Sequence, residues 1–316
     1  MECSASGHGS KPVLFKNMKL SNTSKTIIII LKVVITAFIL YFIFKKIQFQ
    51  QLIHDFISIK IWIIIVIILT TIIKLLIQAY NWGKYLKLNS DYAPKKYEVL
   101  KSYFVGLALR FLGPGGIGVI GKIYFVNNKK KATLASIGVE RIFLTWKNLF
   151  FAAFAAIFFF TEINMIIKIT VLIAVVFLPF IIYLFSYFTK NENIQSYLFN
   201  YLKRTPGIML AQVIFVLITF YQYFILLRNF VDISFFKIMI SVPLIHISHI
   251  IPLSFNGFGL RETFAIEVFS KYGIGAELAV TATFLIFFFN SVIPALIGVY
   301  YIFRIKYSKE PIVYEN

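Results

Sequence analysis

Long apolar stretches, separated by short polar segments, follow one another along almost the whole chain. A helix needs about 20 mostly apolar residues to cross a bilayer. Stretches of about this length lie at residues 26–44, 57–79, 133–160, 164–188, 207–227, 234–251 and 276–303. The pattern therefore predicts an all-α, polytopic integral membrane protein with about seven to eight transmembrane helices.

Two further apolar stretches, residues 103–126 and 252–272, are interrupted by glycine and proline. With a cytoplasmic N-terminus, the inside segments carry 18 of the 32 lysines and arginines and the outside segments carry 6, as expected for a membrane protein. For the C-terminus to lie inside as well, 103–126 must enter and leave from the cytoplasmic side, and 234–272 must do so from the outside. This predicts two re-entrant hairpins in an inverted-repeat-like arrangement. The alternative is that both are ordinary kinked spans.

The same topology predicts how the chain is organised. We expect a cytoplasmic N-terminal tail at residues 1–25, a single transmembrane domain at 26–305 and a cytoplasmic C-terminal tail at 306–316. The protein would be a multi-pass protein of the cell (plasma) membrane.

The composition agrees with a membrane protein, and this changes how the net positive charge is interpreted. Hydrophobic residues make up 59% of the chain and charged residues only 14%, against about 25% in soluble domains. A formal net charge of +19 commonly indicates nucleic-acid binding. Here most basic residues fall in predicted cytoplasmic segments, so no nucleic-acid partner is expected. The single cysteine, Cys3, excludes an intrachain disulfide and a cysteine metal site.

The first interrupted stretch, Gly106 to Val126, has the sequence GLALRFLGPGGIGVIGKIYFV. It contains a formal GxGxxG and the start of a P-loop, but Ile123 follows Lys122 where a P-loop needs Ser or Thr. We therefore expect no nucleotide and no other cofactor. Exposed N–H groups of its glycines are suited to anions. The residues expected to break the helix here are Pro114, Gly115 and Gly118.

The second interrupted stretch, Ile250 to Phe269, has the sequence IIPLSFNGFGLRETFAIEVF. A new helix is predicted to open near Leu260, after breaks at Pro252, Asn256, Gly257 and Gly259. Helix N-termini favour anions, so Arg261 in the first turn predicts a phosphate-binding site. The alternative is that Arg261 and Glu262 pair with each other as a structural clip.

Charges at membrane depth are costly and usually face the interior, so they are the candidate functional residues. The surplus of cations predicts an anionic ligand, and arginine suits phosphate well. Lys32, Lys74 and Lys168 are expected to be ordinary helix-face or snorkelling lysines. The predicted headgroup-binding residues are Arg261, Lys122, Arg110 and Arg141, Lys147 is a further cation at this depth, and the predicted charge partners are Glu140, Glu262 and Glu267.

Three further expectations concern partners within the membrane. Pairing of Arg141 with Glu262, or of Glu140 with Arg261, would join the two hairpins. His246 and His249 share a helix face, yet no local Glu or Cys completes a ligand set. A hydrogen-bonded pair or a proton relay is therefore favoured over a metal site.

Three motifs resemble the lysylphosphatidylglycerol synthase transmembrane-domain family, also described as flippase-like proteins. LGPGGIGVIGKIYFV is similar to that family's PGxxGExxR region, with Val119 at the usual Glu and Lys122 at the usual Arg. GVERIF, from Gly138 to Phe143, resembles the following "ER" helix, and IPLSFNGFGLRE, from Ile251 to Glu262, resembles PxSxxGxGxRE. The resemblance covers roughly residues 25–305. It implies a lipid-handling membrane domain, here as a stand-alone member without the aminoacyltransferase domain.

The resemblance and the cations together predict a lipid translocase that moves or binds a phosphate-bearing lipid through a central cationic cavity. Its partners would be anionic or phosphate-bearing membrane lipids and a separate synthase or glycosyltransferase. One alternative is a membrane enzyme or accessory protein of polyprenyl- or dolichol-phosphate-linked glycan assembly, with buried glutamates as acid and base. Another is a scaffold for a synthase that transports nothing.

Overall fold

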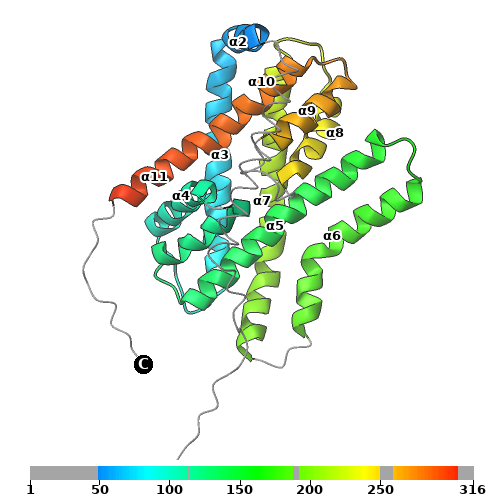
Figure 1. Ribbon diagram of the computed structural model, residues 1–316. Helices are drawn as coiled ribbons and strands as arrows, with labels where there is room; N and C mark the ends of the chain where they lie inside the picture. The colour runs from blue at the N-terminus through cyan, green and yellow to red at the C-terminus, as the bar shows by residue number, and fades with distance from the viewer. Residues whose placement is uncertain (1–48, 113, 188–191, 250–258, 305–316) are drawn as a thin grey trace, which may run out of the picture.

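The computed structural model describes residues 49–112, 114–187, 192–249 and 259–304 (Figure 1). Every regular element within these residues is helical. The elements are α2 (Phe49–Ile57), α3 (Ile61–Leu86), α4 (Lys96–Leu112), η1 (Pro114–Phe125), α5 (Lys130–Phe159), α6 (Met165–Tyr187), α7 (Glu192–Leu227), α8 (Phe235–His246), η2 (Ile247–His249), α9 (Leu260–Ser270), α10 (Ala276–Phe287), η3 (Phe288–Val292) and α11 (Ile293–Arg304). The expected span at 26–44 and the expected breaks Pro252, Asn256 and Gly257 lie outside the described residues.

The predicted all-α membrane architecture is confirmed. Within the described residues, four continuous helices are long and apolar enough to cross a bilayer, namely Ile61–Leu86, Lys130–Phe159, Tyr197–Leu227 and Ala276–Phe303. Each of them overlaps a span expected from the sequence. Shorter apolar helices at Met165–Phe180 and Phe235–His246 correspond to two more of the expected spans.

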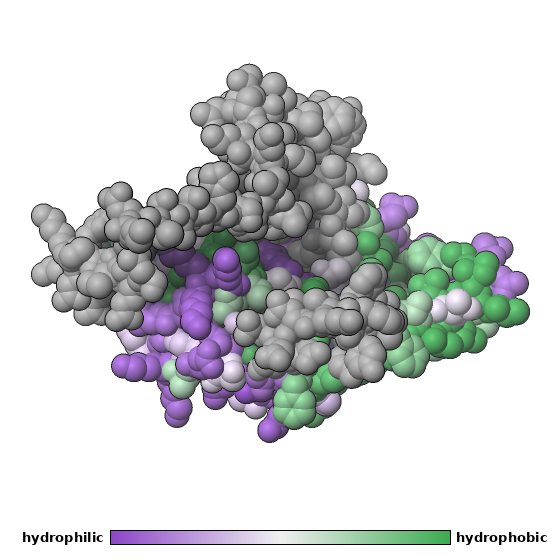
Figure 2. All heavy atoms as spheres, turned by 90° about the horizontal axis from the view of Figure 1, so that it is seen from below, coloured by the Kyte–Doolittle hydropathy of each residue, from purple (hydrophilic) through white to green (hydrophobic). Residues whose placement is uncertain are grey.

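The loops gather at two ends of the helical bundle. At one end, the amide of Asn89 donates to Asn128 at 2.7 Å and the amide of Asn200 donates to the carbonyl of Leu88 at 3.4 Å. We call this the basic end, because its segments 87–95, 127–131 and 197–204 carry many lysines and arginines. Figure 2 shows it from below, with hydrophilic residues gathered on one side and apolar residues where α5 and α6 extend outward.

The other end, which we call the opposite end, is formed by the remaining loops. The amide of Asn229 donates to the carbonyl of Ser58 at 3.3 Å, and the ammonium of Lys271 lies 4.1 Å from the ring centre of Phe159. The sequence predicted the loops of the basic end to be inside and these loops to be outside. The grouping of the loops therefore agrees with the predicted topology.

The first interrupted stretch folds as a hairpin of α4 and η1, which we call hairpin 1. Its arms are antiparallel, because Gly106 lies against Lys122 and Leu109 lies against Gly121. The backbone N–H of Asn127 donates to the carboxylate of Glu98, so the hairpin returns to the basic end from which it starts. The 3₁₀ arm begins at Pro114, which cannot continue an α-helix.

Glu98 also binds Tyr92 in the loop that precedes hairpin 1. The Tyr92 hydroxyl donates to the carboxylate that receives the Asn127 N–H. Burial and this hydrogen bond together raise the pKa of the Tyr92 phenol. The phenol therefore stays protonated and keeps donating to Glu98 at pH values well above neutral.

Of the second interrupted stretch the structure describes α9, which packs against α8 and η2; we call these three elements hairpin 2. The ammonium of Lys237, near the start of α8, lies 5.5 Å from the ring centre of Tyr272, just after α9. Hairpin 2 therefore starts and finishes at the opposite end. The predicted arrangement, two interrupted hairpins that enter from opposite ends, is confirmed.

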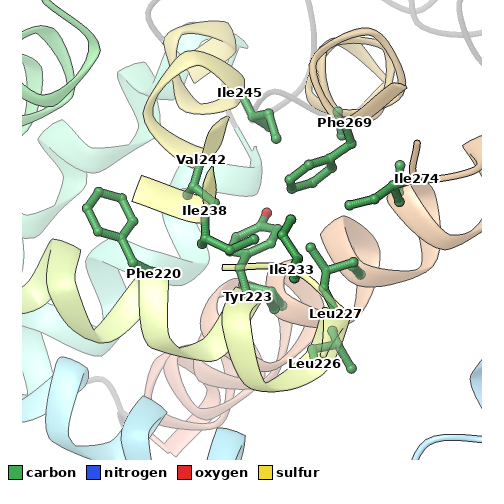
Figure 3. Packing of buried hydrophobic residues seen from close by; sticks show 14 of the residues in the cluster. Phe220, Tyr223, Leu226, Leu227, Ile233, Ile238, Val242, Ile245, Phe269 and Ile274 are labelled. Atoms are coloured by element: carbon green, nitrogen blue, oxygen red, sulfur yellow. The ribbon is translucent and has the colours of Figure 1, made fainter. Parts of the chain in front are cut away.

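Aliphatic and aromatic side chains pack hairpin 2 against α7 (Figure 3). In lipid, such packing stabilises by close van der Waals contact rather than by escape from water. Side chains from α7, α8 and α9 in this cluster have 1% or less of their surface exposed: Tyr223, Leu227, Ile238, Val242 and Phe269.

Helix α3 is polar on its inner face and apolar on its outer face. Its buried residues include Thr71, Lys74 and Gln78. Large apolar side chains on the same helix are exposed at Ile65, Leu69, Ile72, Ile73 and Leu76. In a soluble protein the apolar side chains of a helix would be buried and the polar ones exposed. The reverse arrangement here suits a helix that faces lipid on one side and polar groups on the other.

Candidate functional site: a buried cationic centre

Lys122 and Glu140 form a buried ion pair that fixes hairpin 1 to α5. The Lys122 ammonium donates to both carboxylate oxygens of Glu140, at 2.9 and 2.7 Å, and lies 4.0 Å from the ring centre of Trp82. The two side chains are 3% and 8% exposed. A Cβ on Gly106 would stand 2.0 Å from the Lys122 Cε, so glycine there makes room for the lysine. Lys122, predicted to bind a headgroup, is thus neutralised by Glu140.

Arg261 and Glu262 form a second buried ion pair, at the start of α9. The Arg261 guanidinium donates to Glu262 and lies 4.1 Å from the ring centre of Phe287. The other Glu262 oxygen accepts the backbone N–H of Gly259 at 2.7 Å. Gly259 has φ of 86°, a conformation that favours glycine. Arg261 and Glu262 therefore pair with each other as a structural clip. This is the arrangement that the sequence offered as the alternative to a phosphate site at Arg261.

The two pairs exclude the cross-hairpin pairing considered from the sequence. Glu140 binds Lys122 and Glu262 binds Arg261, each from its own side of the bundle. Among the described side chains, neither Arg141–Glu262 nor Glu140–Arg261 forms an ion pair. Each hairpin instead has one buried ion pair near its own helices.

Arg110, near the tip of hairpin 1, lies among other cations. Its charge interacts with those of Lys122, Arg141 and Lys147. The Arg110 Nε is buried and has no hydrogen-bond partner among the described residues. Glu140 interacts with Arg141 and Lys147 as well, but its carboxylate is already bound by Lys122. The structure therefore brings three of the four predicted headgroup residues together, Arg110, Lys122 and Arg141.

Two buried lysines extend this group of cations into the middle of the bundle. The ammonium of Lys147 lies 3.8 Å from the ring centre of Phe215, and that of Lys74 lies 4.6 Å from the same point. Lys74 is 4% exposed and Lys147 7%. The prediction that Lys74 is a helix-face or snorkelling lysine is wrong, because its helix turns it toward α7. We call Lys74, Arg110, Arg141 and Lys147, with the Lys122–Glu140 pair, the cationic centre.

Amide and hydroxyl groups hold Lys74 in place. Its ammonium donates to Gln222 Oε1 at 3.0 Å, and the Asn290 amide donates to the same oxygen at 2.9 Å. The Thr71 hydroxyl donates to Asn290 Oδ1 at 2.8 Å. Asn290 lies in η3, a π-helical turn of the kind that often marks functional sites.

The sequence carried a signal for this polar face. On α3, Thr71, Lys74, Gln78, Trp82 and Tyr85 are three or four residues apart and so share one side of the helix. All five are buried. Polar residues with helical spacing inside an apolar span therefore indicate the helix face that points inward.

The other predicted residues lie away from the cationic centre. Glu267 is exposed on α9, in contrast to its neighbours Arg261 and Glu262. Lys168 donates to the carbonyls of Ile157 and Phe160 at the end of α5, at 2.9 and 3.0 Å. Its place near a span end agrees with the prediction, and it binds the final turn of the neighbouring helix.

Two further features predicted from the sequence are His246 and the breaks in the interrupted stretches. The ring of His246 lies 6.1 Å from that of Tyr223. Within the described part of the chain, no three His, Cys, Asp or Glu side chains come together as a metal site would require. Gly115 and Gly118 lie in η1 with Pro114, and Gly259 immediately precedes α9.

These features define a multi-pass α-helical membrane protein with two opposed hairpins and a buried cationic centre. The family model described as the lysylphosphatidylglycerol synthase TM region matches residues 29–298, and the chain belongs to this family. It is thus a membrane protein of a family related to lipid handling, and the resemblance noted in the sequence is confirmed. No curated protein gives a match to the chain.

Proposed function

We propose that this protein is a lipid translocase that binds a phosphate-bearing lipid at the cationic centre and moves it between leaflets. The observation that carries the proposal is the surplus of buried positive charge. The charge of Lys147 interacts with those of Lys74 and Arg110, and neither Lys74 nor Lys147 forms an ion pair with a described carboxylate. Among the described residues, the carboxylate that acts on Lys147 is Glu140, which is held by Lys122. An anionic headgroup would supply the missing negative charge.

The two hairpins take a structural part in this proposal. Lys122–Glu140 and Arg261–Glu262 hold the hairpins in place, while Lys74, Arg110, Arg141 and Lys147 are the residues that would receive the phosphate. Arginine suits this role because its guanidinium stays charged and can donate two parallel hydrogen bonds to phosphate oxygens. Interrupted helices near the middle of a bundle are typical of transporter binding sites.

The proposed location and orientation in the membrane follow from the distribution of lysine and arginine. The basic end would face the cytoplasm of a plasma membrane, with both chain termini on that side. The transmembrane domain would extend over residues 26–305, with tails at 1–25 and 306–316. A separate synthase or glycosyltransferase would supply or use the lipid.

Translocation in proteoliposomes tests the function directly. Purified protein is reconstituted with fluorescent analogues of several anionic phospholipids and of phosphatidylcholine, and the outward-facing label is quenched with dithionite. We expect faster access of anionic lipids than in empty vesicles, and a loss of about tenfold in Arg110→Gln. Wild-type rates equal to those of empty vesicles for every anionic lipid would overturn the proposal.

A matched control separates loss of binding from loss of folding. Lys237→Gln also removes a cation, but at the exposed opposite end, where its ammonium contacts Tyr272. It should translocate at the wild-type rate. Equal losses in Arg110→Gln and Lys237→Gln would contradict a role for Arg110.

A further inference from the structure

The ring of Phe215 lies within reach of two buried ammonium groups, which come from different helices. Lys147 on α5 approaches to 3.8 Å and Lys74 on α3 to 4.6 Å of the ring centre. Neither lysine forms an ion pair with a described carboxylate, and the charges that act on Lys147 are those of Arg110, the stronger, and of Glu140, which Lys122 already binds. Phe215 offers both of them the negative face of its ring.

Two buried like charges are costly without an opposite charge. Burial of a cation is costly unless it is paired, and a cation–π contact returns only part of that cost. The charges of Lys74 and Lys147 also repel each other. An anion between them would remove both penalties.

The surroundings of Lys74 hold its ammonium by hydrogen bonds but do not neutralise it. Gln222 accepts from Lys74 at 3.0 Å, and Asn290 and Thr71 hold Gln222 and each other in turn. A second amide pair, Gln78 and Gln212, joins the same helices at 3.0 Å. Amides and hydroxyls leave the charge on Lys74 uncompensated, and such preorganised groups are typical of a binding site.

We propose that Lys74 and Lys147, whose ammonium groups both lie at the ring of Phe215, form a binding site for a dianionic phosphate group. The inference rests on the proposed function and deepens it by naming the class of headgroup. A terminal phosphate (a phosphomonoester) carries about −1.5 to −2 charges at neutral pH, which matches two lysines. A phosphodiester headgroup carries one negative charge and matches them less well. The ligand is a lipid phosphomonoester or free inorganic phosphate, which share this chemistry.

Thermal unfolding of the full chain in detergent tests the site independently of transport. The probes are inorganic phosphate, short-chain phosphatidic acid as the monoester, and short-chain phosphatidylglycerol as the diester. A ligand that binds the folded protein raises the melting temperature. We expect phosphatidic acid to act at concentrations about tenfold below phosphatidylglycerol, and Lys74→Met and Lys147→Met to need about tenfold more of it.

The melting temperatures of the two methionine variants should show a pattern that a purely structural role of the lysines would not produce. Replacing one lysine by methionine relieves the repulsion, so the ligand-free variants should melt at or above the wild-type temperature while losing the response to ligand. Lys74→Arg and Lys147→Arg keep the charge and should keep the response. Lys168→Met removes a buried lysine elsewhere and should also respond like the wild type.

The outcomes separate the site from the transport activity. A response to inorganic phosphate as strong as that to phosphatidic acid, with a weaker response to phosphatidylglycerol, supports the site and assigns it to free phosphate. Lysine-dependent binding without translocation supports the site and overturns the proposed function. Translocation by a wild type whose melting responds equally to all probes, or identical responses in Lys147→Met and wild type, overturns the site and leaves the function standing.

Discussion

The ammonium of Lys122 and the carboxylate of Glu140 are joined by two hydrogen bonds in a part of the bundle where both side chains are almost fully buried. They lie 18 positions apart in the chain, on hairpin 1 and on α5. The pair therefore connects an interrupted segment to a continuous span. Since Trp82 on α3 covers the same ammonium, three elements meet at one lysine.

Breaking this pair should be strongly destabilising. Glu140→Gln or Lys122→Met leaves the partner charge buried and unpaired, at an expected cost of about 3–5 kcal/mol. The double variant Lys122→Met/Glu140→Leu removes both charges and should recover most of that loss. Unfolding in detergent with increasing denaturant gives the free energies for the double-mutant cycle. Simple addition of the two single losses would show that the residues are not coupled.

Close approach of hairpin 1 to α11 should depend on one glycine. A Cβ on Gly298 would stand 2.0 Å from the carbonyl oxygen of Phe104, and backbone cannot yield as a side chain can. We expect Gly298→Ala to lower the free energy of unfolding by about 1–3 kcal/mol.

Gly138 provides the matched control for this substitution. It lies in α5, and a Cβ there would meet nothing within 4 Å. Gly138→Ala should therefore stabilise the helix by about 0.5–1 kcal/mol. Chemical denaturation of both variants measures the difference. A Gly298→Ala variant as stable as Gly138→Ala would contradict the close packing of α4 on α11.

The architecture could be predicted from the sequence because the membrane limits what each segment can do. Apolar length identified spans such as 207–227, and glycine and proline at Pro114 and Gly259 identified the interruptions. The unequal distribution of lysine and arginine between the two sides then required each interrupted stretch to leave the membrane on the side from which it entered. The structure has both hairpins in these orientations.

The pairing of charges could not be predicted in the same way. Nothing local in the sequence indicates that Lys122 binds Glu140, because the partners lie on separate elements whose rotation depends on packing. Arg261 and Glu262 are sequence neighbours, so their pairing was available as an alternative. Lys74 taken alone predicts a helix-face lysine, whereas its spacing from Thr71 and Gln78 places all three on one buried face.

Glu262 should contribute more to stability than its neighbour Glu267. It accepts the Gly259 N–H and also neutralises Arg261, so Glu262→Ala removes a helix cap worth about 1 kcal/mol and leaves a buried arginine unpaired. A total loss of about 3–5 kcal/mol is expected. Glu267→Ala, on the exposed face of the same helix, should change stability by less than about 0.5 kcal/mol. Similar losses in the two variants, measured by denaturation, would argue against the clip.

Orientation in the membrane can be tested with single cysteines, because the chain has only Cys3. In a Cys3→Ser background, Ser90→Cys places a thiol at the basic end and Thr161→Cys places one at the opposite end. Both positions are exposed, and within the described residues each hydroxyl bonds to an adjacent acidic residue alone, so each substitution should cost little.

Impermeant maleimide added to intact cells should label Thr161→Cys, and Ser90→Cys should react only after permeabilisation. The physical reason is the excess of lysine and arginine at the basic end, which keeps those loops on the cytoplasmic side. The Cys3→Ser parent controls for background labelling. The reverse pattern would invert the proposed orientation. Hairpin 1, with Arg110 near its tip, would then enter the membrane from the outside. Labelling of both positions in intact cells would contradict the assignment of the two ends to opposite faces of the membrane.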